Sequence, residues 1–386
     1  MSRLLVLGSL AESLTHFRGP LLREAIARGH EVIGCAPHAP EAVRRELQAM
    51  GVAYRHVSLA RAGMNPLQDA RTLLSLIALM KETKPDLFLG YTIKPVVYGS
   101  LAARIAGVPK IFSMVEGLGY AFSGDGAKRR LLASVAKRLY RSALRCNERV
   151  FFLNTDDVRK FNELGLVAHP DQAVLLNGIG VDLKKFSVKN FPAEFSFLMI
   201  ARLLRDKGIV EYVDAARLVK RRYPQVKFRL VGGLDENPSA ISKRQLSAWV
   251  DEGVIEYLGE LADVRPAIAD SSVYVLPSYR EGRPVTVMEA MAMGRPVIST
   301  DVPGCRETVR HGENGVLVPA RDSMAVAREM EHFIQHPEDV KIMGRSSRTI
   351  AERLYDINKT NNKVLEVLCL NKNNTDTVRQ KNNISL

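Results

Sequence analysis

Cysteine is scarce in this chain, and its cysteines show no arrangement typical of a disulfide framework or a zinc site. The 386 residues include four cysteines, none of them in the paired spacing of metal ligands. They stand at Cys35, Cys146, Cys305 and Cys369. We therefore expect small buried thiols in a protein of the reducing cytoplasm.

Long hydrophobic runs and two common nucleotide-binding fingerprints are also missing. No stretch reaches the roughly 18 consecutive apolar residues that span a bilayer, and the short apolar start indicates a first β-strand rather than a signal peptide. The first strand is followed by GSLAESLTHF instead of Gly-x-Gly-x-x-Gly, and the GxxxxGK[ST] pattern does not occur. These absences disfavour nicotinamide chemistry and ATP hydrolysis of the P-loop type.

Acidic residues are outnumbered, which gives the chain a formal net charge of +13 and an attraction to anions. The excess is concentrated at residues 128–149, which carry eight Lys or Arg and the single acid Glu148. This segment has an apolar stripe, so it predicts a helix that packs on its own sheet with a solvated basic face, or one that rests on an anionic membrane surface. Nucleic-acid binding is disfavoured because only Tyr140 interleaves the charges.

Short apolar strands alternate with amphipathic helices, which predicts βαβ units and mostly parallel sheets covered on both faces. Strands are predicted at residues 4–8, 31–36, 86–90, 110–114, 149–154, 195–201, 227–231, 273–276 and 296–300. Helices are predicted at residues 17–28, 41–50, 96–106, 209–221, 284–293 and 323–335, with a helical pattern at 341–368. A stretch rich in Gly, Pro and charge at 178–194 is the expected linker.

We therefore predict two doubly wound, Rossmann-like α/β domains that face each other across a cleft. The first spans 1–187 and the second 188–349, with a C-terminal helix at about 350–368 that packs back on the first domain. The Asn-rich residues 371–386 predict a disordered tail. Ligands of such sheets bind outside the carboxyl ends of the strands, so the cleft is the expected site.

The most informative stretch is SYREGRPVTVMEAMAMGR at residues 278–295. Pro284 is placed as the first helical residue and Gly294 as the stop. Because the helix between them is apolar all round, we expect it to be buried. Its first turn, at Val285 and Thr286, would offer free N–H groups to an anion.

The two glutamates of this stretch point to a nucleotide-sugar. With a diphosphate at the helix start, Glu289 would lie one turn deeper, within reach of ribose hydroxyls, and Glu281 on the preceding loop could meet a sugar. The alternative is a core helix whose Glu289 pairs with a structural arginine.

A second charged element is ARLLRDKG at residues 201–208. Arg202 follows a predicted strand and Lys207 precedes a predicted helix, so both cations lie on one βα loop. Two such cations can flank a diphosphate and stabilise a leaving group as its charge develops. The alternative is a solvated loop with incidental charge.

Together these motifs resemble glycosyltransferase family 4, whose members are retaining enzymes with the GT-B fold. Glu281 and Glu289, eight positions apart, are similar to its E-x7-E signature, ARLLRDKG resembles its phosphate motif, and GVLVPARD resembles its next block. RAGMNPLQD, YTIKPVVYGSLAAR and VEGLGYAF resemble a bacterial branch that builds O-antigen, capsule and N-glycan oligosaccharides on undecaprenyl diphosphate. Familiar members of that branch transfer N-acetylgalactosamine or N-acetylfucosamine from UDP-sugars.

The resemblance implies a transferase that moves a hexosyl or N-acetylhexosaminyl group from a UDP-sugar to an undecaprenyl-diphosphate-linked saccharide, with no metal or other cofactor. Arg202 and Lys207 would contact the donor diphosphate, and Glu281 the donor sugar or the reacting centre. Glu289 would hold the ribose. The other expected donor contacts are backbone groups at Gly282, Val285 and Thr286, and the base-binding loop at Leu258 and Leu261.

On the acceptor side, the chain departs from the family pattern. Where many members carry a histidine after the fifth strand, this chain has Glu116 as the candidate substitute. His16, after the first strand, could face the acceptor or be a helix-capping or surface histidine, and Lys94 could meet an acceptor phosphate. We expect the protein at the inner face of the cell membrane, held peripherally by residues 128–149. Two alternatives are a UDP-sugar 2-epimerase of the same architecture and a non-enzymatic basic binding protein.

Overall fold

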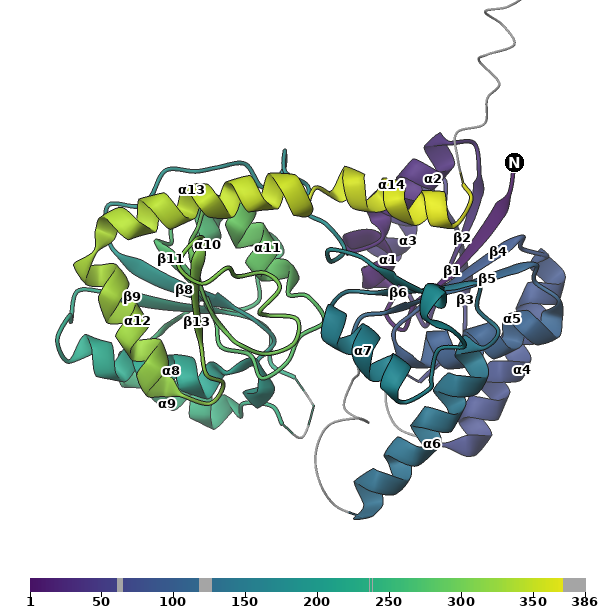
Figure 1. Ribbon diagram of the computed structural model, residues 1–386, viewed down its shortest axis with the longest axis horizontal. Coiled ribbons are helices and arrows are strands. Elements are labelled where there is room, and N and C mark those ends of the chain that lie inside the picture. Colours follow the sequence, from purple (N-terminus) through teal and green to yellow (C-terminus); the bar gives the residue numbers. More distant parts are fainter. Residues whose placement is uncertain (61–64, 118–126, 236, 238, 371–386) are drawn as a thin grey trace, which may run out of the picture. The chain divides into compact units, whose positions relative to one another are not determined.

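The computed structural model describes residues 1–60, 65–117, 127–235, 237 and 239–370. The chain forms two compact units: unit 1 is Met1–Leu176 together with the chain from Asn361 onward, and unit 2 is Asn177–Thr360. Each has a parallel sheet with helices on both sides (Figure 1). The tail predicted at 371–386 lies outside the described residues, as do parts of the motifs at 61–69 and 115–122. The predicted cleft between two domains stays a prediction.

Unit 1 is built on seven parallel strands in the order β3-β2-β1-β4-β5-β6-β7. Its elements are β1 (Arg3–Leu7), α1 (Glu12–His16), α2 (Gly19–Ala27), β2 (Glu31–Ala36), α3 (Glu41–Ala49), β3 (Ala53–His56), α4 (Pro66–Thr83), β4 (Leu87–Tyr91), the π-helix η1 (Pro95–Gly99), α5 (Ser100–Ala106), β5 (Lys110–Val115), α6 (Ala127–Leu144), β6 (Arg149–Phe152), α7 (Thr155–Glu163), η3 (Pro170–Gln172) and β7 (Ala173–Leu175). The strand order reverses between β1 and β4, where a doubly wound sheet offers its ligand crevice.

Unit 2 is built on six parallel strands in the order β10-β9-β8-β11-β12-β13. Its elements are β8 (Ser196–Ile200), η4 (Arg205–Lys207), α8 (Ile209–Lys220), β9 (Lys227–Val231), α9 (Lys243–Asp251), β10 (Glu256–Tyr257), α10 (Arg265–Ala269), β11 (Val273–Leu276), α11 (Val285–Ala292), β12 (Val297–Thr300), β13 (Gly315–Val318), α12 (Ser323–Gln335), α13 (Pro337–Leu354) and the start of α14 (Ile357–Val367). Here the order reverses between β8 and β11.

The sheets are positioned by apolar strands and by helices whose first turns are capped. The strands β1, β4, β8 and β11 are buried along almost their whole length. Asn65 accepts hydrogen bonds from the N–H groups of Leu67 and Gln68 at the start of α4, and Asp322 accepts one from Ala325 at the start of α12. In unit 2, α8 packs against α12 on one side of the sheet, while α11 packs against α13 on the other (Figure 1).

Several boundaries differ from the sequence predictions. The basic helix ends at Leu144 instead of 149, because the chain turns at Cys146 and Asn147 and Arg149 opens β6. The helical pattern at 341–368 is two helices, since Tyr355 caps α13 and α14 begins at Ile357. All four cysteines are free; Cys35 and Cys305 are buried as expected, whereas Cys146 is half-buried and Cys369 is exposed.

The deepest charge in unit 2 is Arg295, which has no exposed surface. Its guanidinium lies over the ring of Phe191, with its central carbon 4.7 Å from the ring centroid. It donates to five backbone carbonyl oxygens, those of Ile268, Ala269, Lys189, Asn190 and Met293, at 2.8–3.2 Å. Burial lowers its pKa to about 10. This side chain therefore ties α10 and the end of α11 to the segment that leads into β8.

We predict that Arg295→Met lowers the free energy of unfolding of unit 2 by about 3 kcal/mol or more, because buried carbonyl oxygens lose their donors. Urea unfolding would measure the change. The matched control is Arg222→Met, since Arg222 is 71% exposed and its ion pair within the described part of the chain is with Glu331; it should change stability by less than about 0.5 kcal/mol. Equal effects of the two substitutions would contradict the assigned role of Arg295.

Candidate functional site

The carboxyl edge of the unit 2 sheet gathers the charged residues that the sequence singles out. Arg202 follows β8, Lys207 ends the short helix η4, and Glu281 lies on the loop between β11 and α11. Strands β8 and β11 are neighbours at the reversal of strand order. The structure therefore brings these loops to the position where ligands of doubly wound sheets bind.

Lys207 and Glu281 form a partly buried ion pair at this edge. The Lys207 ammonium donates to Glu281 Oε1 at 2.6 Å, and the two side chains are 19% and 13% exposed. The Ser278 hydroxyl donates to the same carboxylate oxygen at 2.8 Å. The Glu281 N–H donates to the Pro303 carbonyl at 3.0 Å, so both backbone and side chain of Glu281 are fixed.

Two glycines allow the backbone to come close around this pair. Gly208 has φ +77°, and a Cβ there would lie 2.1 Å from the Pro277 carbonyl oxygen at the end of β11. Gly304 has φ +86°, and a Cβ there would lie 2.2 Å from the Glu281 carbonyl oxygen. Any other residue at either position would push the loops apart and separate Lys207 from Glu281.

Helix α11 presents uncapped N–H groups beside the pair. Pro284 is its N-cap in extended conformation, rather than its first helical residue as predicted, and no side chain caps the helix. The Thr286 hydroxyl is held by Tyr274, whose OH lies 2.6 Å from it, and thereby fixes the helix start to β11. The N–H groups of Val285 and Thr286 therefore remain as an anion site, next to Gly282 in the preceding loop.

Glu289 lies one turn further along α11, among buried apolar residues. Among the described residues its carboxylate has no hydrogen bond and no ion pair, so the alternative of a structural arginine partner is wrong. Burial raises its pKa to about 7, although the positive charge of Lys185 opposes the shift; the negative charge of Asp263 adds to it. A carboxyl kept unpaired at such a cost is typical of a binding or catalytic group.

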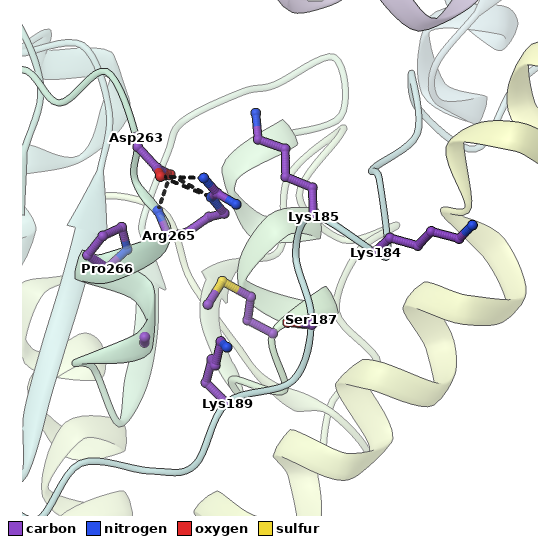
Figure 2. Close-up of a pocket in the computed structure, with 9 residues that line it drawn as sticks. Lys184, Lys185, Ser187, Lys189, Asp263, Arg265 and Pro266 are labelled. Carbon is purple, nitrogen blue, oxygen red and sulfur yellow. Dashed lines mark hydrogen bonds and ion pairs between the residues drawn. The ribbon is translucent and has the colours of Figure 1, made fainter.

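Unit 2 also contains a basic pocket of about 350 Å³, whose lining includes Lys185 and Asp263, the two residues whose charges act on Glu289. Figure 2 shows Lys185 and Lys189 on one side of it and the Asp263–Arg265 pair on the other. Arg265 binds both oxygens of Asp263, at 2.8 and 2.6 Å, and holds the pKa of that carboxyl at about 2. Because the positive charge of Arg265 compensates the negative charge of Asp263, the lysines give the pocket a net positive charge.

The other predicted donor residues lie at the same edge but outside the ion pair. Arg202 is 54% exposed and pairs with Asp235 at 3.0 Å, so its guanidinium is not joined to Lys207 or Glu281 by any contact among the described residues. Leu258 is 39% exposed directly after β10, and Leu261 packs partly against the core. These three remain predicted donor contacts.

In unit 1, the three predicted acceptor residues lie in different surroundings. His16 is the exposed last residue of α1. Lys94, after β4, donates to Asp69 at 2.7 Å, so its charge is already compensated. Glu116 directly follows β5 and pairs with Arg18, which is buried.

Sequence reasoning missed the partners Ser278, Asp69 and Arg18, which hold Glu281, Lys94 and Glu116. It also missed Lys185 and Asp263, whose charges act on Glu289 without a hydrogen bond or ion pair. Each of these residues is distant along the chain from the group it acts on, except Ser278, which stands three residues before Glu281. A serine so close to a motif glutamate was the one local signal. In the described part of the chain no three His, Cys, Asp or Glu residues are grouped to hold a metal ion, and no helix is long and apolar enough to cross a membrane.

Comparison with known families matches each unit to one family. Residues 18–178 match the family described as "Glycosyl transferase 4-like domain". Residues 194–336 match the family described as "Glycosyl transferases group 1". The second match includes Arg202, Lys207, Glu281 and Glu289.

Two relatives and one solved structure define the similarity further. The N,N'-diacetylbacillosaminyl-diphospho-undecaprenol alpha-1,3-N-acetylgalactosaminyltransferase of Campylobacter jejuni is 28% identical over 88% of this chain and 90% of that protein. The UDP-Gal:alpha-D-GlcNAc-diphosphoundecaprenol alpha-1,3-galactosyltransferase of Escherichia coli is 27% identical over 66% and 68%. HepE of Anabaena, solved with UDP and glucose, shares the fold, with a TM-score of 0.76 at 19% identity over 96% of this chain and 100% of that one.

We predict that Glu289→Gln makes the stability of the protein less dependent on pH. A carboxyl whose pKa rises on folding from 4.5 to about 7 stabilises the folded state most at low pH, and this contribution is lost as pH rises through that window. Between pH 5 and pH 8 the wild type should therefore lose roughly 2.5 kcal/mol of unfolding free energy relative to the variant. Urea unfolding at the two pH values measures the difference. The exposed Glu338→Gln should keep the wild-type profile; parallel profiles for Glu289→Gln would contradict the prediction.

Proposed function

This chain belongs to the glycosyltransferases, with a 4-like first unit and a group 1 second unit, and from that premise we propose its substrates and mechanism. It is a two-domain α/β transferase of the GT-B class. We propose that it moves a hexosyl or N-acetylhexosaminyl group from a UDP-sugar to an undecaprenyl-diphosphate-linked saccharide, with retention at the anomeric carbon, in the assembly of a surface polysaccharide or glycan.

One observation carries the donor proposal: the uncapped start of α11 lies beside the Lys207–Glu281 pair, with the unpaired Glu289 one turn deeper. The helix start and Lys207 suit a diphosphate. An unpaired carboxylate suits the two hydroxyls of a ribose. The uridine base would lie toward Leu258 and Leu261. A UDP-sugar donor is further supported by the name of the Escherichia coli relative and by the UDP and glucose in HepE.

The chemical step then follows from where charge develops. The bond between the anomeric carbon and the diphosphate oxygen breaks, and UDP leaves with the electron pair. Lys207, Arg202 and the N–H groups of α11 stabilise that negative charge, which a bound metal ion would otherwise have to do. Glu281 offsets the positive charge on the sugar ring. The acceptor hydroxyl attacks from the face that UDP leaves, and its proton passes to the departing diphosphate oxygen.

The acceptor proposal is supported by the relatives. The Campylobacter jejuni and Escherichia coli proteins are both named for substrates in which a sugar is linked through diphosphate to undecaprenol. We propose the same class of acceptor here, with its saccharide bound in unit 1 near His16, Lys94 and Glu116.

A lipid-linked acceptor makes the basic helix α6 a candidate membrane contact at the cytoplasmic face. Arg138 and Arg145 are exposed and have no partner among the described residues. Arg141, by contrast, donates to the carbonyl groups of Leu164 and Gly165 at 2.8 and 2.9 Å and so has a structural task. We propose that the exposed cations hold the enzyme loosely on anionic lipid.

We predict that UDP release from one UDP-sugar of a panel depends on a lipid-linked saccharide extracted from membranes. Lys207→Ala should lower the rate about 100- to 1000-fold and Arg202→Ala less, because both remove positive charge from the leaving group. Glu289→Ala should weaken donor binding about tenfold or more. The surface control Arg222→Ala should behave as the wild type.

Three results would contradict this assignment. Unchanged turnover in both Lys207→Ala and Arg202→Ala would exclude the proposed leaving-group stabilisation. Conversion of a UDP-sugar into an isomer without any acceptor would favour the epimerase alternative. Failure of every nucleotide-sugar to react or bind would overturn the donor class.

We predict that Arg138→Glu combined with Arg145→Glu weakens binding to vesicles of phosphatidylcholine and phosphatidylglycerol by more than about thirtyfold at low salt, because two cations are lost and two carboxylates that anionic lipid repels are added. Each surface cation near anionic lipid contributes about 1 kcal/mol. The matched control is Lys243→Glu with Arg244→Glu, the same charge change at two exposed positions of α9. Vesicle flotation measures binding; equal loss in both double variants would show that only net charge matters and would contradict a docking role of α6.

A further inference from the structure

The carboxyl edge of the unit 1 sheet contains a polar cluster at its own reversal of strand order. Strands β1, β4 and β5 are adjacent there; Gly8 directly follows β1, Tyr91 ends β4, and Glu116 directly follows β5. A Cβ at Gly8 would lie 2.3 Å from the Tyr91 hydroxyl, so the glycine admits the tyrosine ring between the strand ends. The Tyr91 hydroxyl is fixed by Ser13, 2.7 Å away.

Arg18 is built into this cluster from the start of α2. It is 3% exposed, and its guanidinium carbon lies 4.7 Å from the centroid of the Tyr91 ring. One of its terminal nitrogens pairs with Glu116 Oε1. Its Nε is buried and has no hydrogen-bond partner among the residues that the structure describes. Burying an arginine with an unsatisfied N–H donor lowers the stability of the fold, so a purely structural role does not explain this arrangement.

A second arginine of unit 1 shows what a structural pair looks like. Arg28 is similarly buried, 8% exposed, and pairs with Glu24, which is 38% exposed. All three of its nitrogens are used, because it donates to Glu24, to the Leu370 carbonyl and to the Asn362 side chain. Arg18 lacks such partners, and its glutamate keeps one carboxylate oxygen without a partner among the described residues.

The charges of this edge favour a neutral polar ligand. Arg18 and Glu116 compensate each other, as do Lys94 and Asp69, 2.7 Å apart on the neighbouring loop. A phosphate would find no uncompensated cation among these four groups. In unit 2, where Lys207 and Arg202 are also paired, the uncapped start of α11 and the pocket lysines supply the additional attraction for an anion. The Glu116 side chain is 29% exposed, and its carboxylate oxygen that does not pair with Arg18 can instead accept a hydrogen bond from a hydroxyl group.

We propose that Glu116 binds a hydroxyl of a sugar ring and that Arg18, stacked on Tyr91, is the residue that positions it. Arg18 holds one carboxylate oxygen and thereby turns the other toward the ligand. This inference rests on the proposed transferase function and adds to it a positioning residue and a neutral sugar subsite in unit 1. The ring comes from the acceptor saccharide or from the donor sugar, and the two sources predict different kinetics.

The test is steady-state UDP release with Glu116→Gln, Arg18→Lys and Arg18→Met, varying acceptor and UDP-sugar in turn, with UDP affinity measured by calorimetry. Glu116→Gln should lower kcat/KM about 10- to 100-fold, as for the loss of a hydrogen bond to a charged group. An increase in KM for the acceptor assigns the ring to the acceptor. An increase in KM for the UDP-sugar, with the Kd of UDP unchanged, assigns it to the donor.

A double-variant experiment on Arg18 and Glu116 distinguishes a positioning role of Arg18 from a general effect on folding. Arg18→Met combined with Glu116→Gln should lose no more than the more affected single variant, while Arg18→Lys should retain part of the activity. The matched control is Glu24→Gln, which disrupts the structural Arg28 pair and should leave both KM values unchanged. Thermal unfolding identifies any variant that fails to fold; Glu116→Gln preserves shape and keeps the test valid if Arg18→Met does not fold.

The inference is overturned if the Glu116→Gln variant binds UDP in calorimetry, releases UDP from the UDP-sugar, and keeps kcat/KM for both substrates within about twofold of the wild type. Additive losses in the double variant would overturn the positioning role of Arg18. If the wild-type protein binds UDP in calorimetry but releases UDP from no UDP-sugar, the proposed transferase function is contradicted instead. This outcome differs from failure of the further inference, in which the wild type is active.

Discussion

The ion pair between Lys207 and Glu281 is the contact on which the donor edge of unit 2 depends. It joins the loop after β8 to the loop after β11, the two strands between which the sheet order reverses. Both charges are mostly buried, so each needs the other, and separating them would leave an uncompensated charge. Gly208 makes the close approach possible because a side chain there would strike the end of β11. The uncapped start of α11 is held beside the pair as a consequence.

Two charged residues of unit 2, Arg295 and Glu289, lie in opposite surroundings. Arg295 is satisfied by carbonyl groups from several segments and stabilises the fold. Glu289 is half-buried and has no such partner among the described residues, and burial raises its pKa. A side chain that destabilises the free protein can be retained when a ligand supplies the missing hydrogen bonds. The contrast separates the structural charge of this unit from its binding charge.

Both units have a parallel sheet whose strand order reverses, but the charges at the carboxyl edges of the two sheets differ. In unit 2 a helix start and the pocket lysines leave a net attraction for anions. In unit 1 the charges are paired off, Arg18 with Glu116 and Lys94 with Asp69. The difference fits a division of labour in which one unit binds a diphosphate and the other a neutral sugar.

The sequence by itself determined the alternating α/β architecture and the buried helix α11, because hydrophobic periodicity and the Pro284 and Gly294 signals are local. It also identified Glu281 and Lys207, since charges after strand ends gather at one edge of a parallel sheet. It missed short elements such as β10 and placed the end of the basic helix too late, because turn hydrogen bonds, and not composition, end that helix. Only the tertiary structure decided that Lys207 is paired, that Glu289 is unpaired and that Arg18 meets Glu116. These are contacts between segments far apart in the chain, and whether a charge is compensated depends on which segment folding brings beside it.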